Sequence, residues 1–61
     1  MPLSSSLLYA HSYAEAISLM RANPGRTVSW DAGDGWKSDG RYDSKLRRNV
    51  IASINPKGEY C

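Results

Sequence analysis

A chain of 61 residues allows one small domain, 1–61, whose core is too small to line a deep substrate cleft within one subunit. Eight basic and six acidic residues give a formal charge of +2, which does not by itself indicate a nucleic-acid or membrane surface. One cysteine, Cys61, and one histidine, His11, exclude an internal disulfide and a Cys/His zinc cluster and favour a reducing, cytoplasmic location.

We predict that residues 1–11 form an N-terminal arm outside the main body of the domain. Residues 1–6 contain no basic residue, and the apolar patch at 7–9 is shorter than the core of a signal sequence or a membrane-spanning helix. We therefore expect neither secretion nor membrane insertion. Within the arm, residues 1–6 are expected to be flexible, whereas residues 7–9 are expected to pack onto the domain or onto another chain.

A helix over residues 13–22 has the clearest pattern in the chain. Ser12 and Glu15 match a capping box, in which the serine hydroxyl accepts a hydrogen bond from the third helical amide and the glutamate reaches back. The run Asn-Pro-Gly at 23–25 then ends the helix and turns the chain. Apolar residues recur at helical spacing on one face, which we expect to pack on the core: Tyr13, Ala16, Ile17 and Met20.

Two alternating segments follow and predict an antiparallel hairpin. Residues 26–30 alternate polar and apolar side chains, with Val28 and Trp30 on one face. Residues 36–43 alternate again, and one of their faces carries charges of both signs that we expect to be exposed. The intervening Asp-Ala-Gly-Asp-Gly run is rich in turn formers, so the two segments are expected to pair across it.

Residues 44–54 fit two structures. Leu46, Val50 and Ile54 have helical spacing, whereas the β-branched residues from position 50 onward favour a strand. We favour a strand over residues 48–54, followed by a turn at 55–58. The predicted fold class is therefore α+β, with one N-terminal helix packed on a small three-stranded antiparallel sheet in the order αβββ.

The sequence carries no catalytic or metal-binding pattern, so we expect no enzyme, cofactor or metal site. Asp31, Asp34 and Asp39 cluster near glycines, but their spacing lacks the alternating ligands and the final glutamate of a calcium loop. Turn formation explains these residues better. The serines lack a nucleophile elbow and a suitable histidine partner.

The candidate contact residues are aromatic and charged side chains of the middle of the chain. Trp30 lies inside a strand and is expected to be core, whereas Trp36 follows the loop and is the better contact candidate. We predict that a protein partner meets the exposed sheet face or the Asp/Gly loop, because aromatic residues and arginine dominate contact hot spots. The predicted partner-binding residues are Trp36, Tyr42, Arg41, Arg47, Arg48 and Asp34.

Three short motifs lie within residues 13–36. They are Tyr13-Ala14-Glu15-Ala16-Ile17, Gly25-Arg26-Thr27-Val28 and Gly35-Trp36. Together they resemble the opening of small phage proteins of the Thoeris anti-defence type, which begin with a Glu-Ala helix, a Gly-Lys-x-Val strand and a Gly-Trp element. The resemblance implies a homo-oligomer that sequesters a signalling nucleotide between subunits, with Trp36 and Arg26 as contacts.

A small single-domain chain without catalytic residues is also similar in type to the accessory proteins with which phages bind a host component. The predicted function is therefore a non-enzymatic inhibitor or adaptor that binds a bacterial host protein, in the host cytoplasm if it is phage-encoded. One alternative is a nucleic-acid-binding accessory protein that uses the basic segment 37–48, although interleaved aspartates oppose it. The other alternative is the oligomeric sequestering protein that the resemblance implies.

Overall fold

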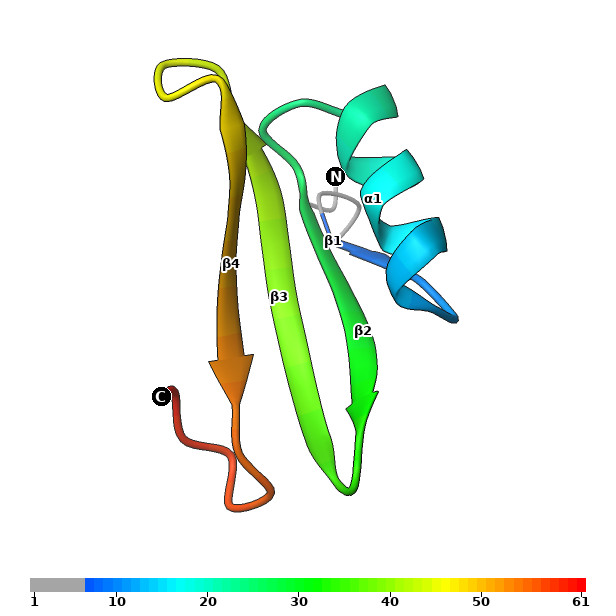
Figure 1. The fold of residues 1–61 in the computed structure, drawn as a ribbon, viewed down its shortest axis with the longest axis vertical. Helices are drawn as coiled ribbons and strands as arrows, with labels where there is room; N and C mark the ends of the chain where they lie inside the picture. Colours follow the sequence, from blue (N-terminus) through cyan, green and yellow to red (C-terminus); the bar gives the residue numbers. More distant parts are fainter. Residues whose placement is uncertain (1–6) are drawn as a thin grey trace, which may run out of the picture.

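The computed structural model describes residues 7–61 and shows an α+β domain with one helix packed on a four-stranded sheet (Figure 1). The fold class predicted from the sequence is confirmed. In chain order the elements are β1 (Leu7–Tyr9), α1 (Tyr13–Ala22), β2 (Thr27–Gly33), β3 (Trp36–Asp43) and β4 (Arg48–Ile54). The strands follow the same order in the sheet, with β1 parallel to β2 and the other neighbours antiparallel.

The sheet has one strand more than the three predicted, and the additional strand is β1, which lies within the segment predicted as an arm. Its three residues pair in parallel with Thr27, Val28 and Ser29 of β2, so this part of the arm packs onto the domain itself. Three residues are too few to show an alternating pattern, and the outer edge of β2 supplies the hydrogen-bonding partners that make them a strand. Residues 1–6 of the predicted arm lie outside the described residues.

Side chains at both ends fix the bounds of α1, which agree with the sequence prediction. The Ser12 hydroxyl accepts a hydrogen bond of 3.1 Å from the Glu15 amide. The Glu15 carboxylate accepts a bond of 2.6 Å from the His11 amide, one residue before the amide that a standard capping box would use. At the other end the Asn23 amide and side chain both donate to the Leu19 carbonyl, at 2.9 and 3.0 Å.

The core lies between α1 and the middle of the sheet. Ala16, Met20 and Val28 are fully buried, and Trp30 is 7% exposed, as its position in the strand predicts. A side chain at Gly40 of β3 would press on the Met20 sulfur at 3.0 Å, so glycine is what lets Met20 rest on the sheet. Tyr13 corrects the predicted helical stripe, because it is 59% exposed; its ring packs edge-to-face on Trp30, with the ring centroids 5.9 Å apart.

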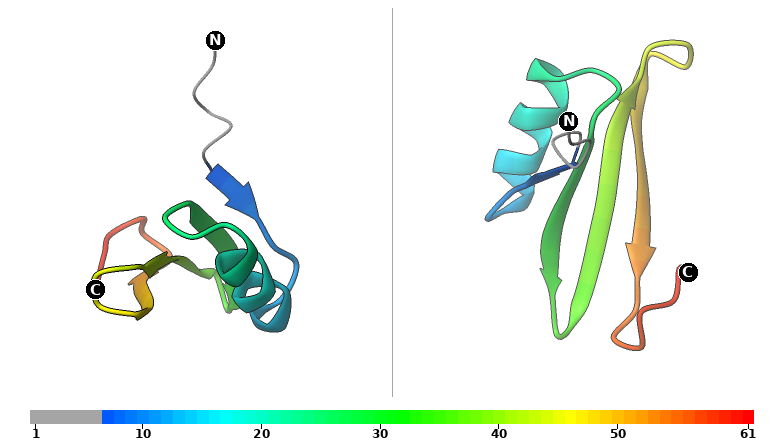
Figure 2. Two further views of the ribbon diagram at one scale, coloured as in Figure 1. Left: turned by 90° about the horizontal axis from the view of Figure 1, so that it is seen from above. Right: turned by 180° about the vertical axis from the view of Figure 1, so that it is seen from behind.

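Helix α1 covers only part of one face of the sheet. It packs mainly against β2 and β3, and the end-on view in Figure 2 shows β4 extending away from it. Val50 and Ile51, which point to opposite faces of β4, are therefore 36% and 42% exposed. One helix ten residues long does not cover four strands, which leaves a large part of this sheet in contact with solvent.

The turns between the strands follow local side-chain chemistry. Asp34 and Gly35 connect β2 to β3 and both have positive φ, 55° and 83°, as the tight Asp-Gly hairpin turn requires. After β4, the Asn55 side chain accepts hydrogen bonds from the amides of Lys57 and Glu59, both at 3.0 Å. This second turn returns the chain so that Tyr60 pairs antiparallel with Ile54.

Candidate binding surface

No described helix packs on the face of the sheet that points away from α1. Val28 and Trp30 point toward the helix, so the residues that alternate with them along β2 point the other way, and the strand register extends this assignment across the sheet. We call this surface the open face. It comprises Leu7, Tyr9, Thr27, Ser29, Asp31, Lys37, Asp39, Arg41, Asp43, Arg48, Val50, Ala52 and Ile54.

Asp39 lies near the middle of the open face and joins three segments of the chain. One carboxylate oxygen accepts a hydrogen bond of 2.5 Å from the Ser29 hydroxyl on β2. The other accepts a bond of 3.1 Å from the phenolic hydroxyl of Tyr60. This hydrogen bond and the negative charge of Asp39 both favour the protonated phenol, so they raise the pKa of Tyr60 above its ordinary value of 10.0.

The ring of Tyr60 borders a hollow on the open face. The hollow has a volume of about 210 Å³ and combines apolar and charged walls. Its lining residues are Thr27, Asp39, Gly40, Arg41, Val50, Ala52 and Tyr60. Tyr60 is 66% exposed, yet its hydroxyl is tied to Asp39, so the ring offers a large contact area at a fixed position. A second hollow, of about 190 Å³, lies toward β1 between Tyr9 and Lys37.

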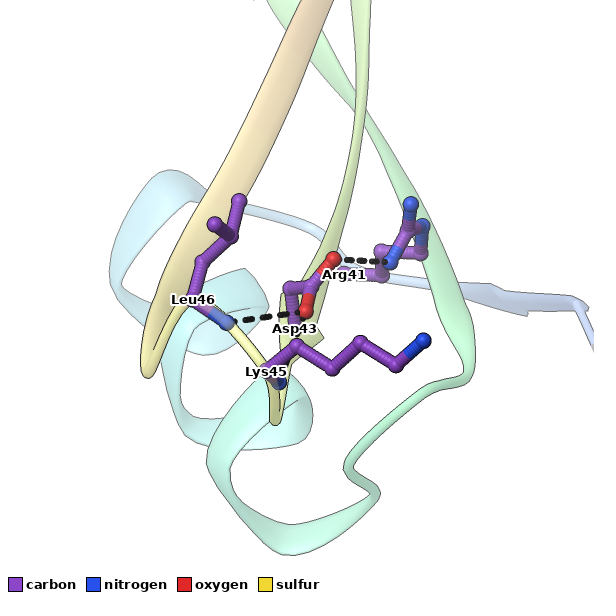
Figure 3. Close-up of polar contacts among 4 residues, drawn as sticks. All are labelled: Arg41, Asp43, Lys45 and Leu46. Carbon is purple, nitrogen blue, oxygen red and sulfur yellow. Dashed lines mark hydrogen bonds and ion pairs between the residues drawn. The ribbon is translucent and has the colours of Figure 1, made fainter.

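Arg41 and Asp43 end the open face at the loop to β4 (Figure 3). The Asp43 carboxylate accepts hydrogen bonds from the backbone amides of Lys45 and Leu46, at 2.8 and 3.1 Å, and from the Arg41 guanidinium at 3.2 Å. These bonds favour the ionised carboxylate, with the Leu46 amide as the main cause, and lower the pKa of Asp43 below its ordinary value of 3.8. Asp43 therefore shapes the loop and holds Arg41 on the surface.

The structure distributes the predicted contact residues over both sides of the sheet. Arg41 and Arg48 lie on the open face, whereas Trp36 and Tyr42 point to the helix side of β3, since side chains alternate along a strand. The remaining two are in connections: Asp34 forms the β2–β3 turn, and Arg47 lies in the β3–β4 loop with φ of 58°. Trp36 and Tyr42 are six positions apart on β3, or about 20 Å, so these two aromatics lie at different ends of the strand.

Tyr60 and its partner Asp39 are the surface residues that sequence reasoning missed. The signal that points to Tyr60 is the Asn-Pro-Lys-Gly turn at 55–58, because a tight turn after a strand returns the chain alongside it. The contact with Asp39, 21 positions earlier, leaves no local pattern in the sequence.

The two contacts implied by the phage-protein resemblance lie at opposite ends of β2. Arg26 directly precedes the strand, whereas Trp36 pairs with Gly33 at its far end. Seven residues of strand between these positions span about 23 Å. Within one subunit, therefore, Arg26 and Trp36 do not contact the same small ligand.

The described residues form a small α+β domain in which no described helix packs on one face of the sheet. Over residues 7–61 there is no group of three or more metal-ligating side chains, and no helix of that part of the chain is long and apolar enough to cross a membrane. Comparison with known proteins gives no match to a family model, to a curated protein or to a solved structure. The function is therefore inferred from the chain's own residues.

Proposed function

We propose that this chain is a small non-enzymatic binding protein, an inhibitor or adaptor that holds one partner protein against the open face. The observation that carries the proposal is the Tyr60 ring, which is tied by its hydroxyl to Asp39 at 3.1 Å beside the hollow that Val50 and Arg41 line. Exposed aromatic and arginine side chains around a pocket are typical of the residues that dominate protein–protein binding energy.

The hydrogen bond to Asp39 makes Tyr60 a better contact residue than a free side chain would be. Tyr60 lies in the tail after β4, where only short pairing with the strand holds the backbone. A partner that met a freely rotating ring would have to order it, at a cost of about 0.5–1.5 kcal/mol for a side chain. Because Asp39 has already ordered the ring, most of this cost is removed before binding.

The charge on the open face favours a protein partner over a nucleic acid. The residues that define this face include three aspartates, Asp31, Asp39 and Asp43, and three basic residues, Lys37, Arg41 and Arg48. A surface with equal numbers of both signs does not provide the basic patch that phosphates require. It suits a protein surface that also carries both signs. A bacterial host protein is the partner we propose, in line with the similarity of type to phage accessory proteins.

Capture from bacterial lysate tests the proposal. Tagged protein is incubated with lysate with and without nuclease, and retained proteins are identified by mass spectrometry. We expect one stoichiometric protein that survives nuclease treatment. Tyr60→Ala is expected to weaken its binding at least tenfold, because truncation of a central aromatic contact typically costs more than about 1.4 kcal/mol.

Matched arginine variants localise the binding site. Arg41→Ala removes a charged side chain from the open face, and Arg21→Ala removes an exposed one from the helix. We expect Arg41→Ala to weaken capture and Arg21→Ala to leave it unchanged, with circular dichroism confirming that both variants fold. Recovery that disappears with nuclease, the absence of any stoichiometric protein, or equal effects of both variants would contradict the proposal.

A further inference from the structure

The outer edge of β4 has unpaired backbone groups. The Ser53 carbonyl accepts a hydrogen bond of 2.9 Å from the Cys61 amide, which lies in the tail and not in β3. Backbone groups in an antiparallel ladder point to alternate sides residue by residue, so Asn49 and Ile51 direct their N–H and C=O groups to the same outer side as Ser53. Figure 1 shows the tail beside one end of β4, and no other described segment flanks the strand on that side.

This edge lacks the features that usually prevent strands from pairing between molecules. The register between β3 and β4 is continuous from Asp43↔Arg48 to Lys37↔Ile54, without a bulge. The segment 49–52 contains no charge, proline or glycine, and its Val50 and Ile51 are exposed on opposite faces. Natural edge strands are generally protected by charges, prolines, bulges or short length. The opposite edge of the sheet is protected by length, since β1 has three residues.

We propose that β4 pairs antiparallel with β4 of a second copy of this chain, with Val50 opposite Val50 on the two-fold axis. In this register Asn49 of each copy lies opposite Ile51 of the other, and the two pairs form four backbone hydrogen bonds. Arg48 lies opposite Ala52, so no like charges face each other across the new ladder. The two sheets become one continuous sheet of eight strands.

The tail and the loop on either side of the free edge restrict the register. A shift of two residues in one direction would pair Asn49 with Ser53, whose outer carbonyl already accepts from Cys61. A shift in the other direction would pair Ile51 with Arg47, which has a φ of 58° and is not extended. The accessible edge is therefore limited to residues 48–52, which is shorter than β4 itself. This length favours a second copy over a longer extended peptide, which would collide with the tail.

A second copy also covers the exposed apolar side chains on both faces at once. Val50 of each copy covers the other on the open face, and Ile51 lies beside Asn49 of the other copy on the helix side. The contact is short, and it buries less than the roughly 800 Å² per partner that is typical of stable complexes. We therefore expect the dimer to form and dissociate as the concentration changes between micromolar and millimolar.

Sedimentation velocity over a concentration series, at full chain length, tests this pairing. The wild-type chain is expected to shift from monomer to dimer between micromolar and millimolar concentration. Val50→Lys places two like charges opposite each other on the axis and is expected to weaken dimerisation at least tenfold. The matched control is Tyr9→Lys, which puts the same charge on an exposed residue of the opposite edge and should leave dimerisation unchanged.

Cysteine cross-linking tests the register in a Cys61→Ser background. A non-hydrogen-bonded antiparallel pair has Cα atoms about 4.5 Å apart, which is within the range of a disulfide. We expect Val50→Cys to cross-link two chains on mild oxidation and Ile54→Cys, on the same face but away from the axis, not to cross-link. Hydrogen exchange gives a readout without substitution: the amides of Asn49 and Ile51 should become more protected as concentration rises.

Three results would overturn the inference. These are a wild-type chain that stays monomeric throughout the series, a dimer that is unaffected by Val50→Lys, and Ile54→Cys that cross-links as readily as Val50→Cys. If the chain is monomeric, the outer edge of β4 is instead available to pair with an extended segment of another protein. None of these measurements depends on the lysate partner, so failure of the dimer and failure of the proposed function are distinguishable.

Discussion

The phenolic hydroxyl of Tyr60 donates a hydrogen bond of 3.1 Å to Asp39, which lies 21 positions earlier in the chain and on a different strand. The same carboxylate accepts from Ser29 on β2, so one side chain of β3 joins β2 and the tail across the open face. The tail is otherwise held by the Ile54–Tyr60 bridge and by the Cys61 amide. The position of the exposed ring thus depends on Asp39.

The first prediction is that Tyr60 titrates at a higher pH than an ordinary tyrosine. Its pKa is raised above 10.0 because the protonated phenol donates a hydrogen bond to the Asp39 carboxylate and because that negative charge opposes the phenolate. A group whose pKa is raised in the folded state stabilises the fold below its unfolded pKa. That contribution is lost as pH rises through the folded value.

Ring resonances of Tyr60, followed by NMR through the alkaline range, measure this pKa. Asp39→Asn is expected to bring it back toward 10.0, because the negative charge is removed while the side-chain shape is kept. Asp31→Asn is the control, since Asp31 is also an aspartate of the open face. Identical Tyr60 titration curves in the wild-type and Asp39→Asn chains would disprove the link between the two residues.

The second prediction is that the two tryptophans contribute very differently to the stability of the fold. Trp30 is 7% exposed and packs in the core, so Trp30→Ala is expected to cost about 3–5 kcal/mol. That loss is comparable to the roughly 3–5 kcal/mol that a core of this size supplies, so the variant should be unfolded. Trp36 is 37% exposed, and Trp36→Ala is expected to cost about 1 kcal/mol or less. Thermal unfolding followed by circular dichroism distinguishes the two variants, and a folded Trp30→Ala chain would refute the assignment of Trp30 to the core.

Local signals in the sequence are sufficient to predict an element when they mark both of its ends. Ser12 and the Asn23-Pro24 pair fix α1 because capping and termination depend on neighbouring residues. Residues 44–54 were ambiguous, since helical spacing and β-branched residues coincide there. Pairing with β3 makes β4 a strand, at the bounds that were favoured. β1 was not predicted as a strand because its structure comes from the edge of β2 rather than from its own three residues.

Contact residues were harder to predict because residue type does not specify direction. Arg41 and Tyr42 are adjacent on β3, so they point to opposite faces, and this follows from strand alternation once the strand is assigned. The exposure of Tyr13 has a different origin. Helical spacing identifies the face of a helix but not how far the neighbouring sheet extends beneath it. The Tyr60–Asp39 contact depends on the return of the tail along β4, so it cannot be predicted from residues that are neighbours in the sequence.

The third prediction concerns the pH dependence of the β3–β4 loop. Hydrogen bonds from the Leu46 and Lys45 amides lower the pKa of Asp43 in the folded chain. A lowered folded pKa stabilises the protein above the unfolded value, near 3.8, and this contribution is lost as pH falls through the folded value. Asp43→Ala should therefore unfold at a lower temperature than the wild type at neutral pH, and the difference should narrow in acid.

Thermal melts at neutral pH and at a series of acidic pH values test this dependence. Asp31→Ala provides the comparison, because it removes an exposed aspartate from the same face without breaking the loop. We expect the Asp31→Ala melting temperature to stay close to that of the wild type at neutral pH. If Asp43→Ala and the wild type differ equally at all pH values, the carboxylate charge has no part in holding the loop.

The fourth prediction concerns the Asp34–Gly35 turn. Both residues have positive φ, and a left-handed conformation costs an L-amino acid with a Cβ about 1–2 kcal/mol. A Cβ at Gly35 would also approach the Pro56 side chain at 3.4 Å, which is ordinary contact, so the backbone conformation is the main cost. Gly35→Ala should therefore lower the free energy of unfolding by about 1–2 kcal/mol in urea denaturation. Asp34→Asn should not lower it, since Asn-Gly is a preferred pair for this turn, and a loss of stability in that variant would argue against the turn geometry.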